Sequence, residues 1–127
     1  PWLPVHPESP TTNVAAQDAD PGSLLSCYRS LLALRRAEPA LQAGALELHD
    51  AARYPPDVVA YRRTLGAGAD RTFADVFLHF GRREVTVDIP DPEGRRVWSN
   101  RGGELLPAEA RRTLGPYEGV VVLSPWA

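Results

Sequence analysis

The sequence predicts a mainly β protein in which an antiparallel β-sandwich follows a proline-rich loop and one long α-helix. Apolar residues recur at helical spacing only within the first forty of the 127 residues. After Pro39 they form short runs, several of them alternating with polar residues, and turn-forming residues separate the runs. Because no helical pattern lies between these runs, the strands are expected to pair antiparallel around a single core.

The first ten residues contain four prolines, with Trp2, Leu3 and Val5 between them. Proline fixes φ and removes a backbone donor, so this segment is predicted to be an ordered but irregular loop. One helical turn is predicted over residues 13–17.

A long helix is predicted over residues 21–36. Asp18 or Asp20 is expected to cap its start, with Pro21 at the first helical position, where proline is tolerated. Pro39 is expected to end it, since a proline disfavours helical geometry in the residue before it. The apolar stripe is wide, which predicts neighbours on two sides. Its members are Leu24, Leu25, Cys27, Tyr28, Leu31, Leu32 and Leu34.

The remaining residues are predicted to form short strands separated by turns rich in Gly, Pro, Asn and Asp. Val85, Val87 and Ile89 alternate with polar residues, so that strand is expected to bury one face only. Residues 72–80 are more continuously apolar, as in a central strand covered on both faces. The predicted strands are residues 46–49, 58–63, 72–80, 84–89, 95–99 and 119–123, with a short additional strand at 113–114.

Composition argues against several classes of protein. All fourteen basic residues are arginines interleaved with sixteen acidic ones, and the formal net charge is −2, so no nucleic-acid partner is expected. No stretch approaches the roughly 20 apolar residues that span a bilayer, and residues 1–19 do not resemble a signal peptide, so no membrane partner is expected. A chain that begins at Pro1 and has no methionine is expected to be a fragment, a processed product or a trimmed chain.

The cysteine and glycine patterns indicate neither a disulfide nor a cofactor. Cys27 is the single cysteine, which is compatible with a reducing compartment, and we expect a cytoplasmic protein. No metal-type cluster of cysteines and histidines is present in the sequence. Gly66 and Gly68 lie between two predicted strands, as in a hairpin loop, rather than between a strand and a helix as in a phosphate-binding loop.

The residues that could carry chemistry mostly have structural explanations. Cys27 could pair with a histidine as nucleophile and base, but a buried, inert cysteine is expected, and His79 within an apolar strand is expected to be a hydrogen-bonded core residue. The acidic residues of the turns, which a two-carboxylate hydrolase would need on a cleft, are expected to make local hydrogen bonds. The histidines considered are His6, His49 and His79, and the acids are Asp57, Asp70, Asp91, Glu93 and Glu104.

Aromatic side chains offer an alternative function. Exposed rings can stack on sugars, so a carbohydrate-binding module is a second hypothesis, although aromatic residues at this frequency usually belong to the core. The candidates for stacking are Tyr54, Trp98 and Trp126. An independent small hydrolase that uses Cys27 and a histidine is a third hypothesis.

Two motifs resemble glycoside hydrolase family 13, the α-amylase family, in its α-glucosidase and oligo-1,6-glucosidase branch. The segments PWLPV, NVAAQ and DPGSLLSCYRSLLALRR occur in the order found in that branch, where the last of them is the final helix of the catalytic TIM barrel. Near the end of the chain, a motif of the form L-x-P-Y-E-x-x-V matches the last strand of the family's all-β C-terminal domain. The matching residues there are Leu114, Pro116, Tyr117, Glu118 and Val121.

The resemblance implies that residues 1–40 are the end of a catalytic barrel and residues 41–127 a C-terminal β-domain. The parent enzyme would be a retaining α-glucosidase acting on oligosaccharides, and the barrel would be the partner of this chain. The family's two aspartates and one glutamate lie on earlier barrel strands, so this chain is expected to be non-catalytic. Trehalose synthases and sucrose isomerases share the motifs, and His6, Glu8 and His79 depart from the branch pattern, so the resemblance implies no single substrate.

The predicted helix also implies a physical consequence for the chain by itself. In a barrel its apolar stripe would be buried, so the isolated chain is expected to fold the stripe onto its own sandwich or to form a homodimer.

Overall fold

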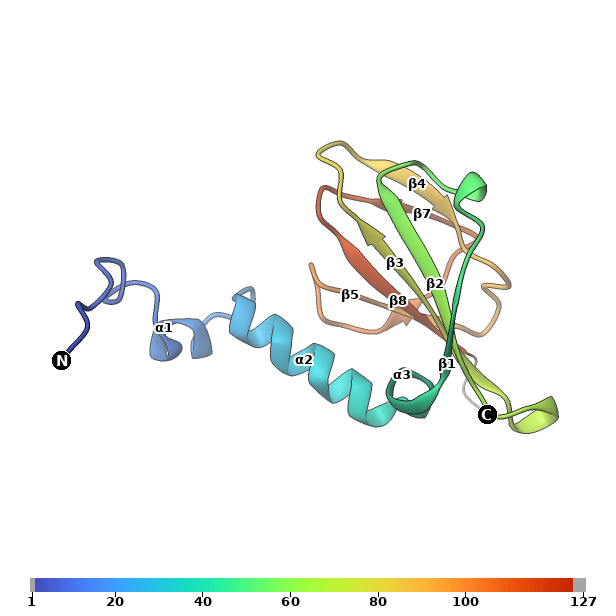
Figure 1. Cartoon of the computed structure of the whole chain (residues 1–127), viewed down its shortest axis with the longest axis horizontal. Helices are drawn as coiled ribbons and strands as arrows, with labels where there is room; N and C mark the ends of the chain where they lie inside the picture. Colours follow the sequence, from blue (N-terminus) through green and yellow to red (C-terminus); the bar gives the residue numbers. More distant parts are fainter. Residues whose placement is uncertain (1, 125–127) are drawn as a thin grey trace.

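The computed structural model describes residues 2–124, and Figure 1 shows the helices at one end of an elongated molecule and the β-sheets at the other. Six strands form one antiparallel sheet in the order β1-β2-β3-β8-β5-β6, and β4 pairs with β7 in a second sheet. The prediction of a mainly β, antiparallel fold is therefore confirmed. The strands are β1 (Ala45–Leu48), β2 (Val58–Leu65), β3 (Thr72–His79), β4 (Val85–Asp88), β5 (Arg96–Ser99), β6 (Leu106–Pro107), β7 (Arg111–Leu114) and β8 (Gly119–Leu123).

The N-terminal helices form close to their predicted positions. Helix α1 (Val14–Asp18) is capped by Asn13, whose side chain accepts a hydrogen bond from the amide of Ala16 at 2.9 Å. Helix α2 (Leu24–Ala37) ends before Pro39, as predicted. Its cap was predicted wrongly, because Ser23 and not Asp18 or Asp20 accepts from the first turn. The side chain of Asp20 instead accepts a hydrogen bond from the amide of Gly22, in a turn before the helix.

Three short helical segments were not predicted. Helix α3 (Pro39–Ala43) uses Pro39 at its first position and buries Ala40 against the sheet. The 3₁₀ turns η1 (Ala51–Arg53) and η2 (Gly68–Asp70) lie in the β1–β2 and β2–β3 connections. Pro39 was taken only as the terminator of the long helix, whereas the fixed φ of proline also suits a helix start. Strand β6, two residues long, was also missed.

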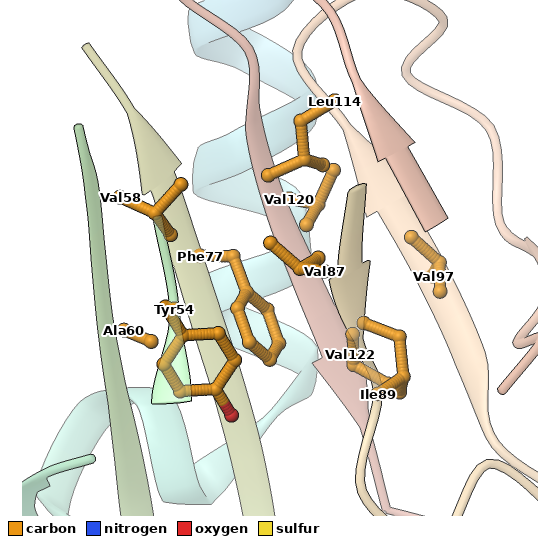
Figure 2. Close-up of a cluster of buried hydrophobic side chains, with 10 residues drawn as sticks. All are labelled: Tyr54, Val58, Ala60, Phe77, Val87, Ile89, Val97, Leu114, Val120 and Val122. Carbon is orange, nitrogen blue, oxygen red and sulfur yellow. The ribbon is translucent and has the colours of Figure 1, made fainter. Parts of the chain in front are cut away.

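The inner face of the six-stranded sheet is closed by β4 and β7. Phe77 on β3 is fully buried, and Val87 and Leu114 of the second sheet belong to the same hydrophobic cluster (Figure 2). The alternation predicted for the strand at 84–89 is confirmed, since Val87 and Ile89 are buried while Thr86 and Asp88 are exposed. The cluster comprises Tyr54, Val58, Ala60, Phe77, Val87, Ile89, Val97, Leu114, Val120 and Val122.

The outer face of the same sheet carries a second cluster that packs against α2. Leu34 is the buried residue of α2, and it meets Val76 and Trp98 from β3 and β5. Successive side chains of a strand point to opposite faces, so Val76 belongs to the outer cluster and Phe77 to the inner one. Strand β3 is therefore covered on both sides, as predicted. The buried members are Leu34, Ala74, Val76, Trp98, Val121 and Leu123.

Candidate functional site

A buried charge cluster lies around Asp75 on β3, on the same face as Phe77. The carboxylate is fully buried and accepts hydrogen bonds from Arg62 Nε at 2.7 Å and Arg62 Nη2 at 2.8 Å. Arg95 Nη2 donates to its Oδ2 at 2.7 Å, and His49 Nε2 lies 2.9 Å from Oδ1. Both carboxylate oxygens are thus occupied by groups of this chain.

The cluster shifts the pKa values of its carboxylate and of the buried Arg95 guanidinium. Burial alone would raise the pKa of Asp75, but the hydrogen bonds from Arg62 and Arg95 outweigh it, and the pKa lies below the ordinary value. Burial lowers the pKa of Arg95, although the contact with Asp75 opposes that shift. An anion held in this way cannot deliver a proton near neutral pH, so Asp75 does not serve as a general acid.

Arg95 owes its burial to a nearly complete set of acceptors. Its Nε donates to the carbonyl of Leu123 at 2.9 Å, its Nη1 to Pro90 at 2.7 Å and its Nη2 to Val122 at 2.8 Å. The guanidinium also lies 4.7 Å from the ring centroid of Phe73. The cluster therefore ties β3 to β8 and to the loop that follows β4.

A second buried carboxylate, Glu118, closes the turn between β7 and β8. Its Oε1 accepts from Ser99 Oγ at 2.7 Å and from Arg112 Nη2 at 3.1 Å, and its Oε2 accepts from the amide of Gly115 at 2.9 Å. Burial raises the pKa of Glu118, but these hydrogen bonds bring it below the ordinary value. Sequence reasoning named Glu118 only as a member of the family motif and did not consider Asp75, because it examined acids in turns as the candidates for chemistry. The five turn acids themselves are all exposed.

Cys27 does not lie beside a histidine that could activate it. It is half-buried on α2 and packs against the outer cluster. His49 stacks on Phe77 and His79 Nδ1 contacts the carbonyl of Gly115 at 2.7 Å, so both lie on the inner side of the sheet. The sheet separates them from the thiol, and the prediction of a hydrogen-bonded core His79 is confirmed. The third histidine, His6, is exposed in the N-terminal loop, where Nδ1 accepts from the amide of Glu8 at 3.3 Å.

Two of the three aromatic residues proposed for sugar stacking, Tyr54 and Trp98, belong to the core. Tyr54 is 9% exposed and meets the ring of Phe77 edge to face, and Trp98 is 4% exposed under α2. The carbohydrate-binding hypothesis requires exposed rings at these two positions, and the structure contradicts that requirement because each ring fills space between elements. Trp126 lies outside the described residues. Within residues 2–124 no group of three or more His, Cys, Asp or Glu could hold a metal ion, and no helix is long and apolar enough to cross a membrane.

Helix α2 carries several exposed apolar side chains. Leu24 is 67% exposed, Tyr28 59% and Leu32 50%, although all three lie on the predicted stripe. The expectation that the chain folds this stripe onto its own sandwich is therefore wrong. Only the side of the helix that carries Leu34 reaches the sheet, because a straight helix cannot turn both edges of a wide stripe to one surface.

The comparisons with known proteins agree on one family. No family model matches the chain. It is 35% identical over 126 residues to an α-glucosidase of Pediococcus pentosaceus and 29% identical over 126 residues to an oligo-1,6-glucosidase of Halalkalibacterium halodurans. The alignments cover 95% and 97% of this chain. The chain belongs to glycoside hydrolase family 13.

Solved structures of family 13 enzymes match the whole arrangement of helices and sheets. A trehalulose synthase of Pseudomonas mesoacidophila superposes with a TM-score of 0.72 at 26% identity, over 97% of this chain and 22% of its own length. A trehalose-6-phosphate hydrolase of Bacillus licheniformis gives a TM-score of 0.70 with the same identity and coverage. The chain spans 20% and 22% of the length of the two curated relatives, so it corresponds to a small part of each.

The family 13 motif at residues 114–121 has a structural explanation. Leu114 is fully buried in the inner core, and Tyr117 adopts a left-handed φ of 55° in the turn. The Glu118 carboxylate accepts from the Gly115 amide, while the Glu118 amide donates to the Gly115 carbonyl at 3.2 Å. The motif thus builds the β7–β8 turn and contributes no reactive group.

Proposed function

We propose that this chain is the non-catalytic C-terminal part of a retaining α-glucosidase and that it supports the catalytic barrel. One observation carries the proposal: α2 packs one side on the β-sandwich and leaves Leu24, Tyr28 and Leu32 exposed on the other. A helix with two apolar sides fits between two bodies, the sandwich on one side and a barrel on the other.

In this proposal residues 1–40 complete the barrel and residues 41–127 form the supporting β-domain. The β-fold begins at Ala45, and α3 already packs on β2 and β3. From residue 2 to the end of α1 no residue belongs to the buried members of either hydrophobic cluster, which supports assigning this segment to another body. A cytoplasmic location is part of the same proposal, and the single Cys27 is compatible with it.

Hydrolysis of α-glucosidic bonds in oligosaccharides would be the activity of the longer polypeptide. The two-carboxylate route needs a proton donor and a nucleophile on opposite sides of a bound sugar. Asp75 and Glu118, the buried acids, are both held by arginines, so neither can fill these roles.

The proposal is tested with p-nitrophenyl α-glucoside. The 127-residue chain is expected to release no nitrophenol above the uncatalysed rate, whereas the full-length polypeptide that carries it is expected to release nitrophenol with retention at the anomeric carbon. Turnover by the isolated chain would overturn the non-catalytic role. An inactive but folded full-length polypeptide would overturn the glucosidase assignment.

A second activity for the parent is isomerisation of sucrose or formation of trehalose. The similarity to a trehalulose synthase, at a TM-score of 0.72, favours keeping this alternative. Chromatography of the products from sucrose separates the two: free glucose and fructose indicate hydrolysis, and an isomeric disaccharide indicates a synthase.

A further inference from the structure

Strand β1 forms an unprotected edge of the six-stranded sheet. It pairs with β2 on one side, and no strand within residues 2–124 pairs with its other side. All four of its residues are exposed. Edge strands of soluble proteins usually carry lysine, proline or a bulge that prevents pairing with another chain. The opposite edge strand, β6, is two residues long and contains Pro107, whereas β1 pairs with β2 in an unbroken register and contains none of these features.

The backbone groups of β1 that face away from β2 belong to Leu46 and Leu48. The amide of His49 donates to the carbonyl of Ala60 on β2 at 3.0 Å, and these two residues lie opposite each other in the continuation of the β1–β2 register. Successive residues of an antiparallel strand direct their N–H and C=O groups to opposite sides. Because those of His49 and Glu47 face β2, those of the two leucines face outward and are offered to another strand.

The inner side of this edge carries charges of both signs. A hollow of about 250 Å³ lies beside β1, and its ionisable lining residues are Glu47, His49, Arg53, Arg62 and Asp91. Glu47 and Arg53 are exposed, whereas His49 and Arg62 are held by Asp75. One acid and one free base thus lie at two points along the same edge, so two copies related by a two-fold axis can each present the acid to the base of the other.

Charge selects among the antiparallel registers that two β1 strands can adopt. Outward groups meet only where a leucine of one copy lies opposite a leucine of the other. Pairing Leu46 with Leu48 places the two Glu47 carboxylates opposite each other, which is unfavourable. Pairing Leu46 with Leu46 brings Leu48 opposite Gly44, whose amide already donates to the carbonyl of Ala40 at 3.0 Å. Pairing Leu48 with Leu48 instead brings each Glu47 opposite the residue two positions on, His49.

We propose that β1 pairs antiparallel with β1 of a second copy of this chain, with Leu48 opposite Leu48 and each Glu47 carboxylate beside His49 and Arg53 of the other copy. The contact is isologous, so each favourable pair of charges occurs twice. It joins the two six-stranded sheets into one continuous sheet. It uses only the edge of the sheet and none of α2, so it stands apart from the proposed function.

A second copy fits this edge better than an unrelated extended peptide, because the same short strand supplies both of the complementary charges. The contact is small, since β1 has four residues. Interfaces well below the usual size of about 800 Å² per partner belong to transient complexes. The dimer is therefore expected to dissociate on dilution.

The experiment is sedimentation velocity of the 127-residue chain across about a hundredfold range of concentration. The parent sequence is expected to pass reversibly from monomer to dimer as the concentration rises. Glu47→Arg and Arg53→Glu are each expected to weaken the dimer about tenfold or more, because like charges then face each other twice. Both residues are exposed, so neither variant is expected to lower the thermal midpoint of the dilute chain.

Mixing the two variants supplies the decisive arm. In an equimolar mixture of Glu47→Arg and Arg53→Glu, each introduced charge meets its opposite on the other chain, and the dimer is expected to return. Leu48→Pro, which removes an outward donor, is expected to abolish the dimer, whereas Leu48→Val keeps the amide and is expected to retain it. The mixing arm changes no backbone group and does not depend on how Leu48→Pro folds.

Two results would overturn the inference. One is a monomer at every concentration, and the other is a dimer that forms equally well in Glu47→Arg alone, which would assign the association to another surface such as the exposed side of α2. Neither result bears on the proposed function, which is decided by the α-glucosidase activity of the full-length polypeptide.

Discussion

The two faces of the six-stranded sheet differ in what covers them. On the inner face Phe77, Val120 and Val122 are closed over by β4 and β7, and the carboxylates of Asp75 and Glu118 accept hydrogen bonds from groups of this chain. On the outer face α2 covers Val76 and Trp98 but leaves the surface toward β1 bare. The inner face is thus closed within this chain, whereas the outer face leaves apolar side chains uncovered, as the proposed contact with a barrel requires.

The largest difference between the faces is expected for truncation of a core residue. Phe77→Ala is expected to lower the free energy of unfolding by about 3–5 kcal/mol, because the fully buried ring leaves a cavity. Leu48→Ala, at an exposed position on edge strand β1, is expected to change the free energy of unfolding by less than about 0.5 kcal/mol in the isolated chain. Urea unfolding of both variants measures the two values. Equal losses would remove the distinction between the faces.

A buried and an exposed ion pair are expected to differ in their contribution to stability. Asp75→Asn is expected to cost about 3–5 kcal/mol, since Arg95 then remains buried without its anion. Asp88→Asn is the control, because Asp88 faces Arg111 across 3.4 Å with both side chains about three-quarters exposed, and such a pair contributes about 0–1 kcal/mol. Chemical unfolding at neutral pH distinguishes them. A loss below about 1 kcal/mol for Asp75→Asn would mean that water satisfies Arg95.

The two buried carboxylates, Asp75 and Glu118, predict that the free energy of unfolding falls in acid, with an effect smaller than that of Asp75→Asn. The pKa values of Asp75 and Glu118 are lower in the folded than in the unfolded chain, so the unfolded chain binds more protons as pH falls. Their contribution is fully present above the unfolded values near pH 4 and is lost as pH falls through the folded values. Unfolding free energy measured from pH 6 to pH 2 should fall below about pH 4, with a shallower slope in Asp75→Asn. An unchanged slope in that variant would assign the acid sensitivity to other groups.

The smallest effect is expected when sugars are added to the isolated chain. Tyr54 and Trp98 are core residues, so neither offers a ring face to a ligand. Calorimetric titration of the isolated chain with millimolar maltose or isomaltose is expected to give no binding heat. Saturable heat would revive the carbohydrate-binding hypothesis and would point to an aromatic residue other than these two.

Local patterns in the sequence predicted most of the fold. The helical spacing of Leu24, Tyr28 and Leu31 and the alternation of Val85, Val87 and Ile89 each reflect one buried face, so periodicity located α2 and β4. Strand β6 and helix α3 were missed because two to five residues are too short to show a period. Figure 1 shows that strands distant in sequence, such as β3 and β8, lie side by side.

The site was harder to predict, because its features depend on pairing between strands. In the sequence Asp75 is an ordinary polar residue within an apolar strand. Only the fold brings it into contact with Arg62 on β2 and with Arg95, which directly precedes β5. The exposure of Leu46 and Leu48 likewise follows from the position of β1 at the sheet edge, which no local pattern indicates.

The central claim is that the outer side of α2 is exposed in this chain and buried in the full-length polypeptide. The most direct measurement is the thermal midpoint of Tyr28→Asp in both contexts, with Ala33→Asp as the control on a different side of the same helix. In the isolated chain the two variants are expected to have equal midpoints, since both residues are exposed. In the full-length polypeptide Tyr28→Asp is expected to lower the midpoint by about 4 °C or more relative to Ala33→Asp. The reason is that the new aspartate would be buried without a partner, which costs free energy. Equal midpoints for the two variants in the full-length polypeptide would contradict the claim.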